Sequence, residues 1–411
     1  MVLTETGARA ERRGLSGGRI SRKRFRDMNA PPRDWLSRHA ADLAGLRQRD
    51  RLRALRPRAG LDFASNDYLG LADSQDYRTA AMQALARGAP LGAGGSRLLR
   101  GNHPEHAALE EEAAAFFGTE SALFFGAGFS ANEALLATLP QRGDLILHDA
   151  LIHASAHEGM RLSRAAARAA PHNDLDGFEA ALAEYRRQNA SGDAWIVVES
   201  VYSMDGDTAP LAELAGLAAR YGAFLVVDEA HATGVHGPGG RGLAHALEGR
   251  ENVLTLHTCG KALGLSGAIL CLPRVLRDFM INRARQFIFA TAPSPLLAAS
   301  VRAALEIVAR SDDRRAALAA RVARLGAGLR RGAAAVPSGS HIQPIVVGAD
   351  GRAVALAERL QAEGFDIRAI RPPTVPEGTA RLRISVTLNV SEDDIDAMLA
   401  RLAQELAELP A

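Results

Sequence analysis

Lysine is nearly absent from this chain: only two of its 49 lysine and arginine residues are lysines. Lys23 lies in an arginine-rich leader, so Lys261 is the single lysine of the remaining sequence. Arginine can form ion pairs as well as lysine does, but its guanidinium stays protonated and cannot form a Schiff base. A compositional bias toward arginine would also leave a stray lysine. The residues around Lys261 therefore have to show whether it is a stray lysine or one that forms a Schiff base.

Three further absences exclude whole classes of function. Cys259 and Cys271 are the only cysteines, which excludes a disulfide framework and a cysteine zinc set and fits a reducing cytoplasm. The net charge is +2, so nothing attracts nucleic acid or an anionic membrane in general. No uninterrupted apolar run is long enough to span a bilayer. We therefore expect a cytoplasmic globular enzyme with no metal, no nucleic acid and no membrane partner.

The length of 411 residues suggests at least two domains. Residues 1–27 are rich in arginine and lack the apolar segment of a secretory signal. We expect them to be a disordered leader, or translation assigned upstream of a start at Met28. The predicted organisation is an N-terminal arm at 1–62, a large domain at 63–300 and a small domain at 301–411.

Short apolar runs alternate with helical patterns over some 200 residues of the middle of the chain. Runs of this kind are typical of strands buried on both faces, and their alternation with helices predicts a mostly parallel α/β sheet. The predicted strands are Ser121–Phe125, Leu145–His148, Trp195–Glu199, Phe224–Asp228, Val253–Leu256 and Ala268–Leu272; the predicted helices include Pro104–Phe117, Asp176–Arg187 and Leu211–Tyr221.

The C-terminal part follows a different pattern. One long helical stretch is predicted from Ser294 to about Arg331. An α+β module follows, and Ser391 with Asp394 predicts a capping box for its last helix. The predicted elements of this module are strands Ile342–Val347, Asp366–Ile370 and Leu382–Val386 and helices Arg352–Glu363 and Glu392–Leu409.

Polar residues follow the predicted strands upstream of Lys261. Ligands of parallel α/β sheets bind at the carboxyl ends of the strands, where Asp228 lies. A carboxylate there suits a protonated pyridine nitrogen, and His231 could reach an oxygen on the same ring. Alone, Asp228 reads equally as a metal ligand or a helix cap, and His231 as a hydrogen-bonded loop histidine.

A glycine-rich turn at Gly126–Asn132 opens a helix whose free N–H groups could bind a phosphate. Its G-x-G-x-x-A pattern is weak and also allows a dinucleotide site, for which Asp144 or Asp149 is in range. Three more polar residues follow strands: His153 could stack on a flat ring, and Ser203 and Thr258 offer hydroxyls. Together with Lys261 these features are hard to obtain by chance.

In this combination the chain resembles the α-oxoamine synthases, a family of fold-type I pyridoxal-phosphate enzymes. The motifs that carry the resemblance are Ser65–Leu71, Gly126–Asn132, Ser203–Asp207, Asp228–Gly234 and Thr258–Lys261. The resemblance implies a large domain with a mostly parallel, seven-stranded sheet and a smaller C-terminal α+β domain. It also implies pyridoxal phosphate as the cofactor and a homodimer with the site at the subunit interface.

The resemblance assigns roles to particular residues. Lys261 is expected to hold the cofactor as a Schiff base and then to act as general base, with His153, Asp228 and His231 completing the catalytic set. The expected cofactor-binding residues are Gly128, Phe129, His153, Ser203, Asp228, His231, Thr258, Lys261 and Thr291, the last from a second subunit. The expected substrate-binding residues are Arg53, Asn66, His153, Arg371, Thr374 and Arg383.

The substrate class also follows from resemblance. Residues 369–383 and 172–174 are most similar to the family members of biotin biosynthesis, which condense L-alanine with a pimeloyl thioester. The acyl carrier (coenzyme A or an acyl carrier protein) stays open, as do the choices of Arg383 or Arg371 for the amino-acid carboxylate and of Arg53 or Arg56 for the acyl substrate. The alternatives are a glycine C-acetyltransferase or another relative using glycine, a nucleotide-binding oxidoreductase, and a non-catalytic regulator.

Overall fold

The computed structural model describes residues 34–188, 191–332 and 336–408. The predicted leader and the predicted start at Met28 lie outside these residues. The chain forms two units, Met1–Leu52 and Arg53–Ala411. In the described part of the first unit, helix α1 (Ser37–Gln48) buries none of its side chains. It ends at Gln48, and the chain adopts a left-handed conformation two residues later, at Asp50 (φ 55°).

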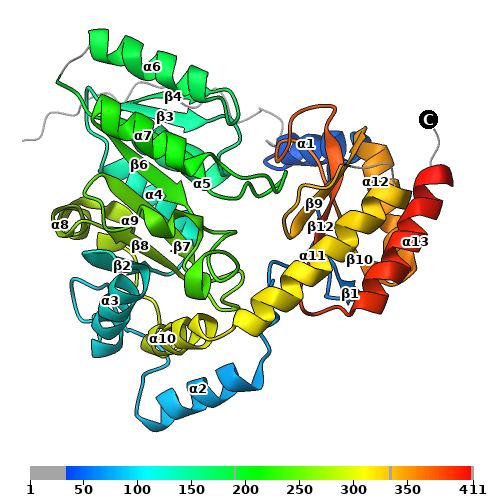
Figure 1. Cartoon of the computed structure of the whole chain (residues 1–411), viewed down its shortest axis with the longest axis horizontal. Helices are drawn as coiled ribbons and strands as arrows, with labels where there is room; N and C mark the ends of the chain where they lie inside the picture. Colours follow the sequence, from blue (N-terminus) through cyan, green and yellow to red (C-terminus); the bar gives the residue numbers. More distant parts are fainter. Residues whose placement is uncertain (1–33, 189–190, 333–335, 409–411) are drawn as a thin grey trace, which may run out of the picture. The chain divides into compact units, whose positions relative to one another are not determined.

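The second unit contains a seven-stranded sheet with the strand order β2-β8-β7-β6-β5-β3-β4. Neighbours from β7 to β4 are parallel, whereas β8 runs antiparallel to both β7 and β2. The mostly parallel sheet is therefore confirmed (Figure 1). The strands are β2 (Ser121–Phe125), β3 (Leu145–Asp149), β4 (Ala166–Ala170), β5 (Ala194–Glu199), β6 (Ala223–Asp228), β7 (Val253–Thr258) and β8 (Ala268–Leu272).

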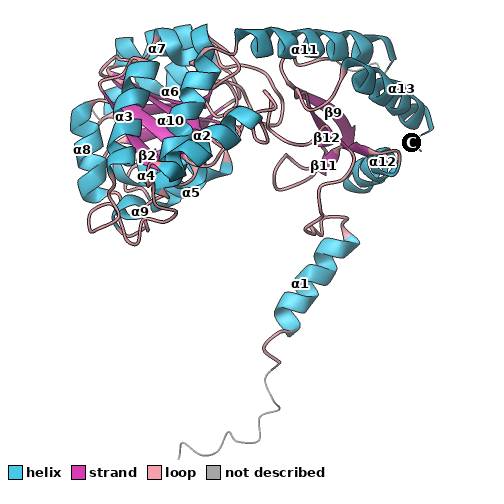
Figure 2. Cartoon of the chain, turned by 90° about the horizontal axis from the view of Figure 1, so that it is seen from below, coloured by secondary structure: helices cyan, strands magenta, loops and turns pink. Residues whose placement is uncertain are grey.

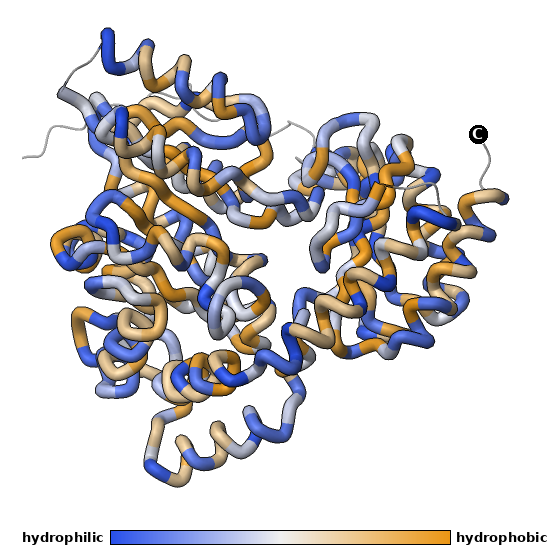
Figure 3. Tube along the Cα trace, in the orientation of Figure 1, coloured by the Kyte–Doolittle hydropathy of each residue, from blue (hydrophilic) through white to orange (hydrophobic). Residues whose placement is uncertain are grey.

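Six of these strands were predicted from their apolar runs, and β4 was missed. The sequence of β4 is AARAA, and four of its five residues are exposed at the edge of the sheet. A strand of this composition gives no apolar run and has little intrinsic β propensity. By contrast, β2, β3, β5, β7 and β8 are buried at every position, and Figure 3 shows the apolar residues concentrated along the sheet.

Helices cover the sheet on both faces (Figure 2). Val197 and Val226 pack in one core cluster with residues of α4, α5, α8 and α9. Val198 and Val227, the next residues of the same strands, pack in another cluster with α6 and α7. The helices of this region are α2 (Gln75–Ala86), α3 (Pro104–Phe117), α4 (Gly128–Thr138), α5 (Ala154–Leu162), α6 (Leu175–Gln188), α7 (Leu211–Tyr221), α8 (Arg274–Arg283), α9 (Arg285–Ile288) and α10 (Pro295–Ala309).

The long helix predicted from Ser294 to Arg331 is wrong: the structure has two helices, α10 and α11 (Asp312–Gly332). The break falls at Arg310 and Ser311, where the buried Ser311 hydroxyl donates to the carbonyl of Ile307. Asp312 and Asp313 then open α11, an acidic first turn that favours a helix start. Residues 310–315 form a polar run that contains neither glycine nor proline, so no helix-breaking residue marks the boundary between the two helices.

The C-terminal module has a three-stranded antiparallel sheet of order β11-β12-β9. The predicted strand Asp366–Ile370 is two short strands, because its halves pair with different partners, β10 with β1 and β11 with β12. The predicted capping box is confirmed: Ser391 Oγ accepts from Asp394 N–H, and the Asp394 carboxylate accepts from Ser391 N–H. The elements are β1 (Leu61–Asp62), β9 (Ile342–Gly348), α12 (Asp350–Ala362), β10 (Phe365–Asp366), β11 (Arg368–Ile370), β12 (Ala380–Ser385) and α13 (Glu392–Glu408).

The predicted domain boundaries at residues 62 and 300 remain predictions. Within the described ranges, no helix combines the length and apolar character that a membrane crossing needs.

Candidate active site

Lys261 lies in the loop between β7 and β8, at the carboxyl end of the parallel strands. Its side chain is partly buried, and among the described residues it has no hydrogen bond or ion pair. Burial lowers the pKa of Lys261 to about 8, although the nearby Asp228 and Glu199 carboxyls oppose this shift. A fraction of the amine is therefore neutral near neutral pH, which a covalent bond to a carbonyl carbon requires.

A chain of hydrogen bonds connects Asp228 with His153. The buried Asp228 carboxylate accepts from the Asn132 amide at 2.7 Å, and the same amide donates to Ser155 Oγ at 3.0 Å. Ser155 Oγ is 2.8 Å from His153 Nδ1, which also accepts from Ser155 N–H. The second Asp228 oxygen accepts from Ala230 N–H at 2.9 Å. Asp228 and His153, the two residues predicted to contact a flat ring, thus belong to one hydrogen-bond network.

His231 is buried and lies 2.6 Å from the Tyr68 hydroxyl through Nδ1. Tyr68 donates to Asn66 Oδ1 at 2.9 Å, and Arg383 donates to both Asn66 and Tyr68. Burial lowers the pKa of His231 well below its ordinary value, and the positive charges of Lys261 and Arg383 lower it further. His231 is therefore a neutral hydrogen-bonding group in this site.

The phosphate-binding prediction falls on the start of α4, where no side chain caps the helix. Gly128 is the first residue of α4, and a Cβ built there would lie 3.3 Å from Thr258 Oγ1. The helix N-terminus and the Thr258 hydroxyl are therefore side by side. Phe129 lies edge-on to His153, with ring centroids 6.5 Å apart. Free N–H groups and a hydroxyl at one point suit an anionic oxygen group.

Arg383 and Ser203 bring the C-terminal sheet to this site. Arg383 lies on β12, is buried, and donates through Nε to the carbonyl of Ser203 at 2.7 Å and through Nη1 to Ser385 Oγ. Arg381, two residues earlier on the same strand, pairs with Asp205. Two arginines of β12 thus hold the loop that carries Ser203.

A cavity of about 430 Å³ opens next to these residues. Its lining includes His153, Ser203 and Thr374, so it gathers predicted residues from three distant parts of the chain. A larger cavity, of about 880 Å³, is lined by residues of α4, α8 and α9 and by none of the predicted site residues. We therefore take the smaller cavity as the substrate space, and its volume is in the usual range for small-molecule sites.

The structure does not bring the other predicted residues to Lys261. Arg53 is exposed, and Arg56 pairs with Glu358 and Gln361 of α12. Arg371 is partly buried just after β11, and Arg383 rather than Arg371 affects the pKa of Lys261. Thr291 is exposed in the loop between α9 and α10; its predicted role needs a second subunit.

Sequence reasoning missed Asn132, Tyr68 and Glu199 as site residues. Asn132 gave a weak signal as a buried amide on the otherwise apolar helix α4. Tyr68 and Glu199 belong to quoted segments, but only the strand order and the tertiary contacts show what they touch. Glu199 is the last residue of β5 and pairs in register with Asp228 of β6.

Known proteins match this chain over most of its length. The family model described as aminotransferase class I and II matches residues 58–402. An 8-amino-7-oxononanoate synthase from Anaeromyxobacter dehalogenans strain 2CP-1 is 43% identical over 395 residues, which cover 92% of this chain and 96% of the relative. The chain belongs to the aminotransferase class I and II family. An 8-amino-7-oxononanoate synthase from Geobacter sulfurreducens is 41% identical and covers 89% of this chain and 98% of its own length.

Solved structures agree with the assignment. A serine palmitoyltransferase solved with its PLP internal aldimine superposes with a TM-score of 0.83 at 25% identity, covering 92% of this chain and 99% of that chain. An 8-amino-7-oxononanoate synthase from Francisella tularensis has a TM-score of 0.72 at 28% identity, covering 85% and 98%. The fold-type I architecture is therefore confirmed, and the chain is a pyridoxal-phosphate-dependent acyltransferase. This decides the cofactor in favour of pyridoxal phosphate rather than a dinucleotide.

The residues present fit this cofactor. Lys261 offers an amine that has no partner among the described residues, and the nearby Asp228 offers a buried carboxylate. Gly128, which has no side chain, leaves the start of α4 accessible beside the Thr258 hydroxyl. The residues thus offer an amine, a carboxylate that suits a ring nitrogen, and a site that suits an anion.

Proposed function

We propose that the protein condenses L-alanine with a pimeloyl thioester and releases CO₂, the thiol carrier and 8-amino-7-oxononanoate, a step of biotin biosynthesis. The observation that carries this proposal is the partly buried Lys261 amine, which has no partner in the described part of the chain and lies close enough to Asp228 and His231 for its charge to interact with both. The 43% identity to a relative of that name supports the choice of substrates.

Pyridoxal phosphate would be held by residues from several loops. Asp228 would pair with the ring nitrogen, His153 would stack on the ring, and Ser203 and His231 would bind its oxygen substituents. The start of α4, Thr258, and Thr291 of a second subunit would bind the phosphate. When bound, the cofactor supplies an electron sink for negative charge that develops at the substrate Cα.

Lys261 has two roles in this proposal. Its Nζ would hold the cofactor covalently until the amino acid takes that place. The released amine, whose pKa burial lowers to about 8, would then accept the proton from the alanine Cα as general base. At this pKa a fraction of the amine is neutral at neutral pH and can accept a proton, and the protonated amine can return it.

Arg383 would bind the alanine carboxylate. Its guanidinium is fixed by the Ser203 carbonyl and by Ser385 and Asn66, so little side-chain entropy is lost on binding. Arg371 is the alternative, and variants of each should separate them by their effect on KM for alanine. Arg53, which is exposed, would bind the far carboxylate of the pimeloyl group, since Arg56 is already paired with α12.

The deciding experiment compares substrate pairs on the purified protein loaded with pyridoxal phosphate. L-alanine with pimeloyl-coenzyme A or pimeloyl-acyl carrier protein should give 8-amino-7-oxononanoate, and glycine with acetyl-coenzyme A should give little product. A preference for glycine and acetyl-coenzyme A would instead make the protein a glycine C-acetyltransferase. Mass measurement in solution tests the proposed homodimer.

A second measurement locates the cofactor. Borohydride reduction of the loaded enzyme should fix a pyridoxyl group on the peptide with Lys261 and leave the peptide with Lys23 unmodified. Since the chain has two lysines, the two peptides report on every lysine in the protein. Equal labelling of both, or none, would contradict the role of Lys261.

A further inference from the structure

The proposed function leaves one buried acid of the site without a role. Glu199 ends β5 and pairs in register with Asp228 of the parallel strand β6. Residues paired in register point to the same face of a sheet, and Val197 and Val226, two residues earlier, both pack against the α4 side. The carboxyls of Glu199 and Asp228 are therefore neighbours on the face where α4 begins.

The two carboxyls differ in their hydrogen bonds. Both oxygens of Asp228 accept, one from Asn132 and one from Ala230 N–H. Glu199 is only 2% exposed; its Oε2 accepts from Ser203 N–H at 3.1 Å, but its buried Oε1 has no partner in the described part of the chain. A buried polar atom left unpaired costs about 1–3 kcal/mol. An oxygen of this kind is expected to meet a group that the protein itself does not supply.

The charges around Glu199 favour its protonated form. Burial and the charge of Asp228 together raise the pKa of Glu199 to about 8, while Lys261 and the Ser203 N–H oppose the shift. Glu199 therefore keeps its proton at neutral pH, as a buried carboxyl beside another carboxyl does. Its titratable neighbours are Asp149, Asp228 and Lys261 together with the phenols of Tyr68 and Tyr202.

We propose that Glu199 binds the cofactor as a neutral carboxylic acid, donating a hydrogen bond from Oε1, while Asp228 alone supplies the negative charge. The acceptor is the phenolic oxygen of the cofactor ring, because Glu199 is bonded to Ser203, the residue proposed to bind that oxygen. The inference rests on the proposed function, since it needs pyridoxal phosphate in this site. The inference adds a contact between Glu199 and the cofactor, and it gives the two adjacent acids different protonation states.

Two variants of the apoenzyme test the contact. In Glu199→Gln an amide N–H replaces the acid O–H, so the affinity for pyridoxal phosphate, measured by absorbance titration, should stay within about threefold of the wild type. In Glu199→Leu no donor remains, and the affinity should fall about tenfold or more. Glu120→Gln, at an exposed glutamate, is the matched control.

The possible results separate this inference from the proposed function. If the Leu variant binds as tightly as the wild type, Glu199 makes no contact. If the Gln variant loses as much as the Leu variant, an ionised carboxylate is required; both results overturn the inference and leave the proposed function intact. A wild-type protein that fails to bind pyridoxal phosphate would instead contradict the proposed function.

An infrared measurement tests the proton directly and needs no Leu variant. The difference spectrum between the wild-type apoenzyme and Glu199→Gln at neutral pH should show the carbonyl band of a protonated carboxylic acid. This band should fade as the pH rises through about 8. A spectrum with only carboxylate bands at neutral pH would overturn the inference.

Discussion

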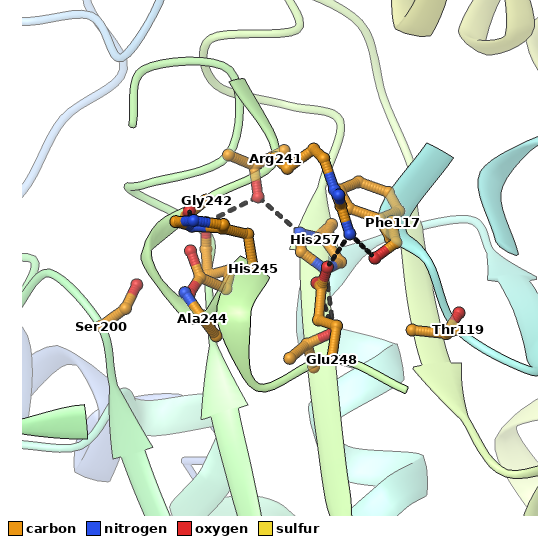
Figure 4. Close-up of polar contacts among 12 residues, drawn as sticks. Phe117, Thr119, Ser200, Arg241, Gly242, Ala244, His245, Glu248 and His257 are labelled. Atoms are coloured by element: carbon orange, nitrogen blue, oxygen red, sulfur yellow. Dashed lines mark hydrogen bonds and ion pairs between the residues drawn. The ribbon is translucent and has the colours of Figure 1, made fainter. Parts of the chain in front are cut away.

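Two buried clusters of charged residues lie on opposite faces of the same strands. Leu256 packs on the α4 side of β7, so His257 points to the other face, where it stacks on Phe117 with ring centroids 3.6 Å apart. Glu248 there accepts from His257 and Thr255 and pairs with Arg241 (Figure 4). Each carboxylate oxygen of this cluster, which we call the His257 cluster, has a donor within the protein.

In the His257 cluster the buried atom without a partner among the described residues is Arg241 Nε, on a guanidinium that is otherwise bonded to Phe117 and Glu248. In the cluster around Lys261 the atoms without a partner belong to the amine and to an acid. The Lys261 amine and Glu199 Oε1 have no partner among the described residues; the glutamate oxygen is buried and the lysine side chain is partly buried. Buried charged groups that are paired within the protein are typical of structural ion pairs. Buried polar groups whose hydrogen-bonding atoms lack a partner in the protein are typical of ligand sites. Glu229, which follows Asp228, is of the paired kind: its carboxylate accepts from two backbone N–H groups, those of residues 243 and 244.

The sharpest test of this difference is Lys261→Arg. The positive charge remains, but the guanidinium cannot bond to the cofactor, so the visible absorbance should vanish and turnover should fall by about a thousandfold or more. The unfolding midpoint should change little, which thermal denaturation would show. Lys23→Arg is the matched control, and an active Lys261→Arg enzyme would disprove the assigned role.

The opposite pattern is expected for Glu248→Ala in the His257 cluster. Removing one partner of a buried ion pair should lower the free energy of unfolding by about 3 kcal/mol, measured by urea denaturation. The affinity for pyridoxal phosphate at a temperature where the variant is folded should be nearly unchanged. Glu251→Ala, at an exposed site, should do neither. A loss of cofactor affinity without loss of stability would erase the distinction between the clusters.

Asn132→Ala tests the network between Asp228 and His153. The substitution removes a hydrogen bond to a charged group, so the affinity for pyridoxal phosphate should fall about tenfold, or about 1.4 kcal/mol. Equilibrium dialysis of the apoenzyme measures this loss. The exposed Asn282→Ala is the control, and an unchanged affinity would mean that Asp228 needs no support from α4.

The smallest effect is expected at His172, which lies between Asp149 and Asp207. Burial acts to lower the pKa of His172, but the hydrogen bonds to both carboxylates raise it to about 10 from an ordinary value of 6.5. A raised pKa stabilises the fold fully below the ordinary value and loses this contribution as the pH rises through about 10.

His172→Gln should therefore flatten the decline of stability between neutral and alkaline pH. Unfolding midpoints over a pH series would show this, with the exposed His39→Gln as the control. An identical pH dependence in wild type and His172→Gln would mean that the two carboxylates do not hold a charged imidazole.

Much of the fold is readable from local pattern. The buried strands are recognisable from the sequence because both of their faces are covered, so most of their positions are apolar. The failures have physical causes: β4 is an exposed, alanine-rich edge strand, and the break at Ser311 falls in a polar run that contains neither glycine nor proline. One predicted strand became two because each half found a different partner.

The sequence by itself determined the chemistry: one lysine after a strand, an aspartate ending another strand, and a glycine turn before a helix. Only the tertiary structure decided which groups meet. Asn132 reaches Asp228 across 96 residues, and Glu199 stands beside Asp228 because β5 pairs with β6 in that register. Local sequence sets what each strand end carries, but strand order and register set the neighbours, and those neighbours set the charge of each group.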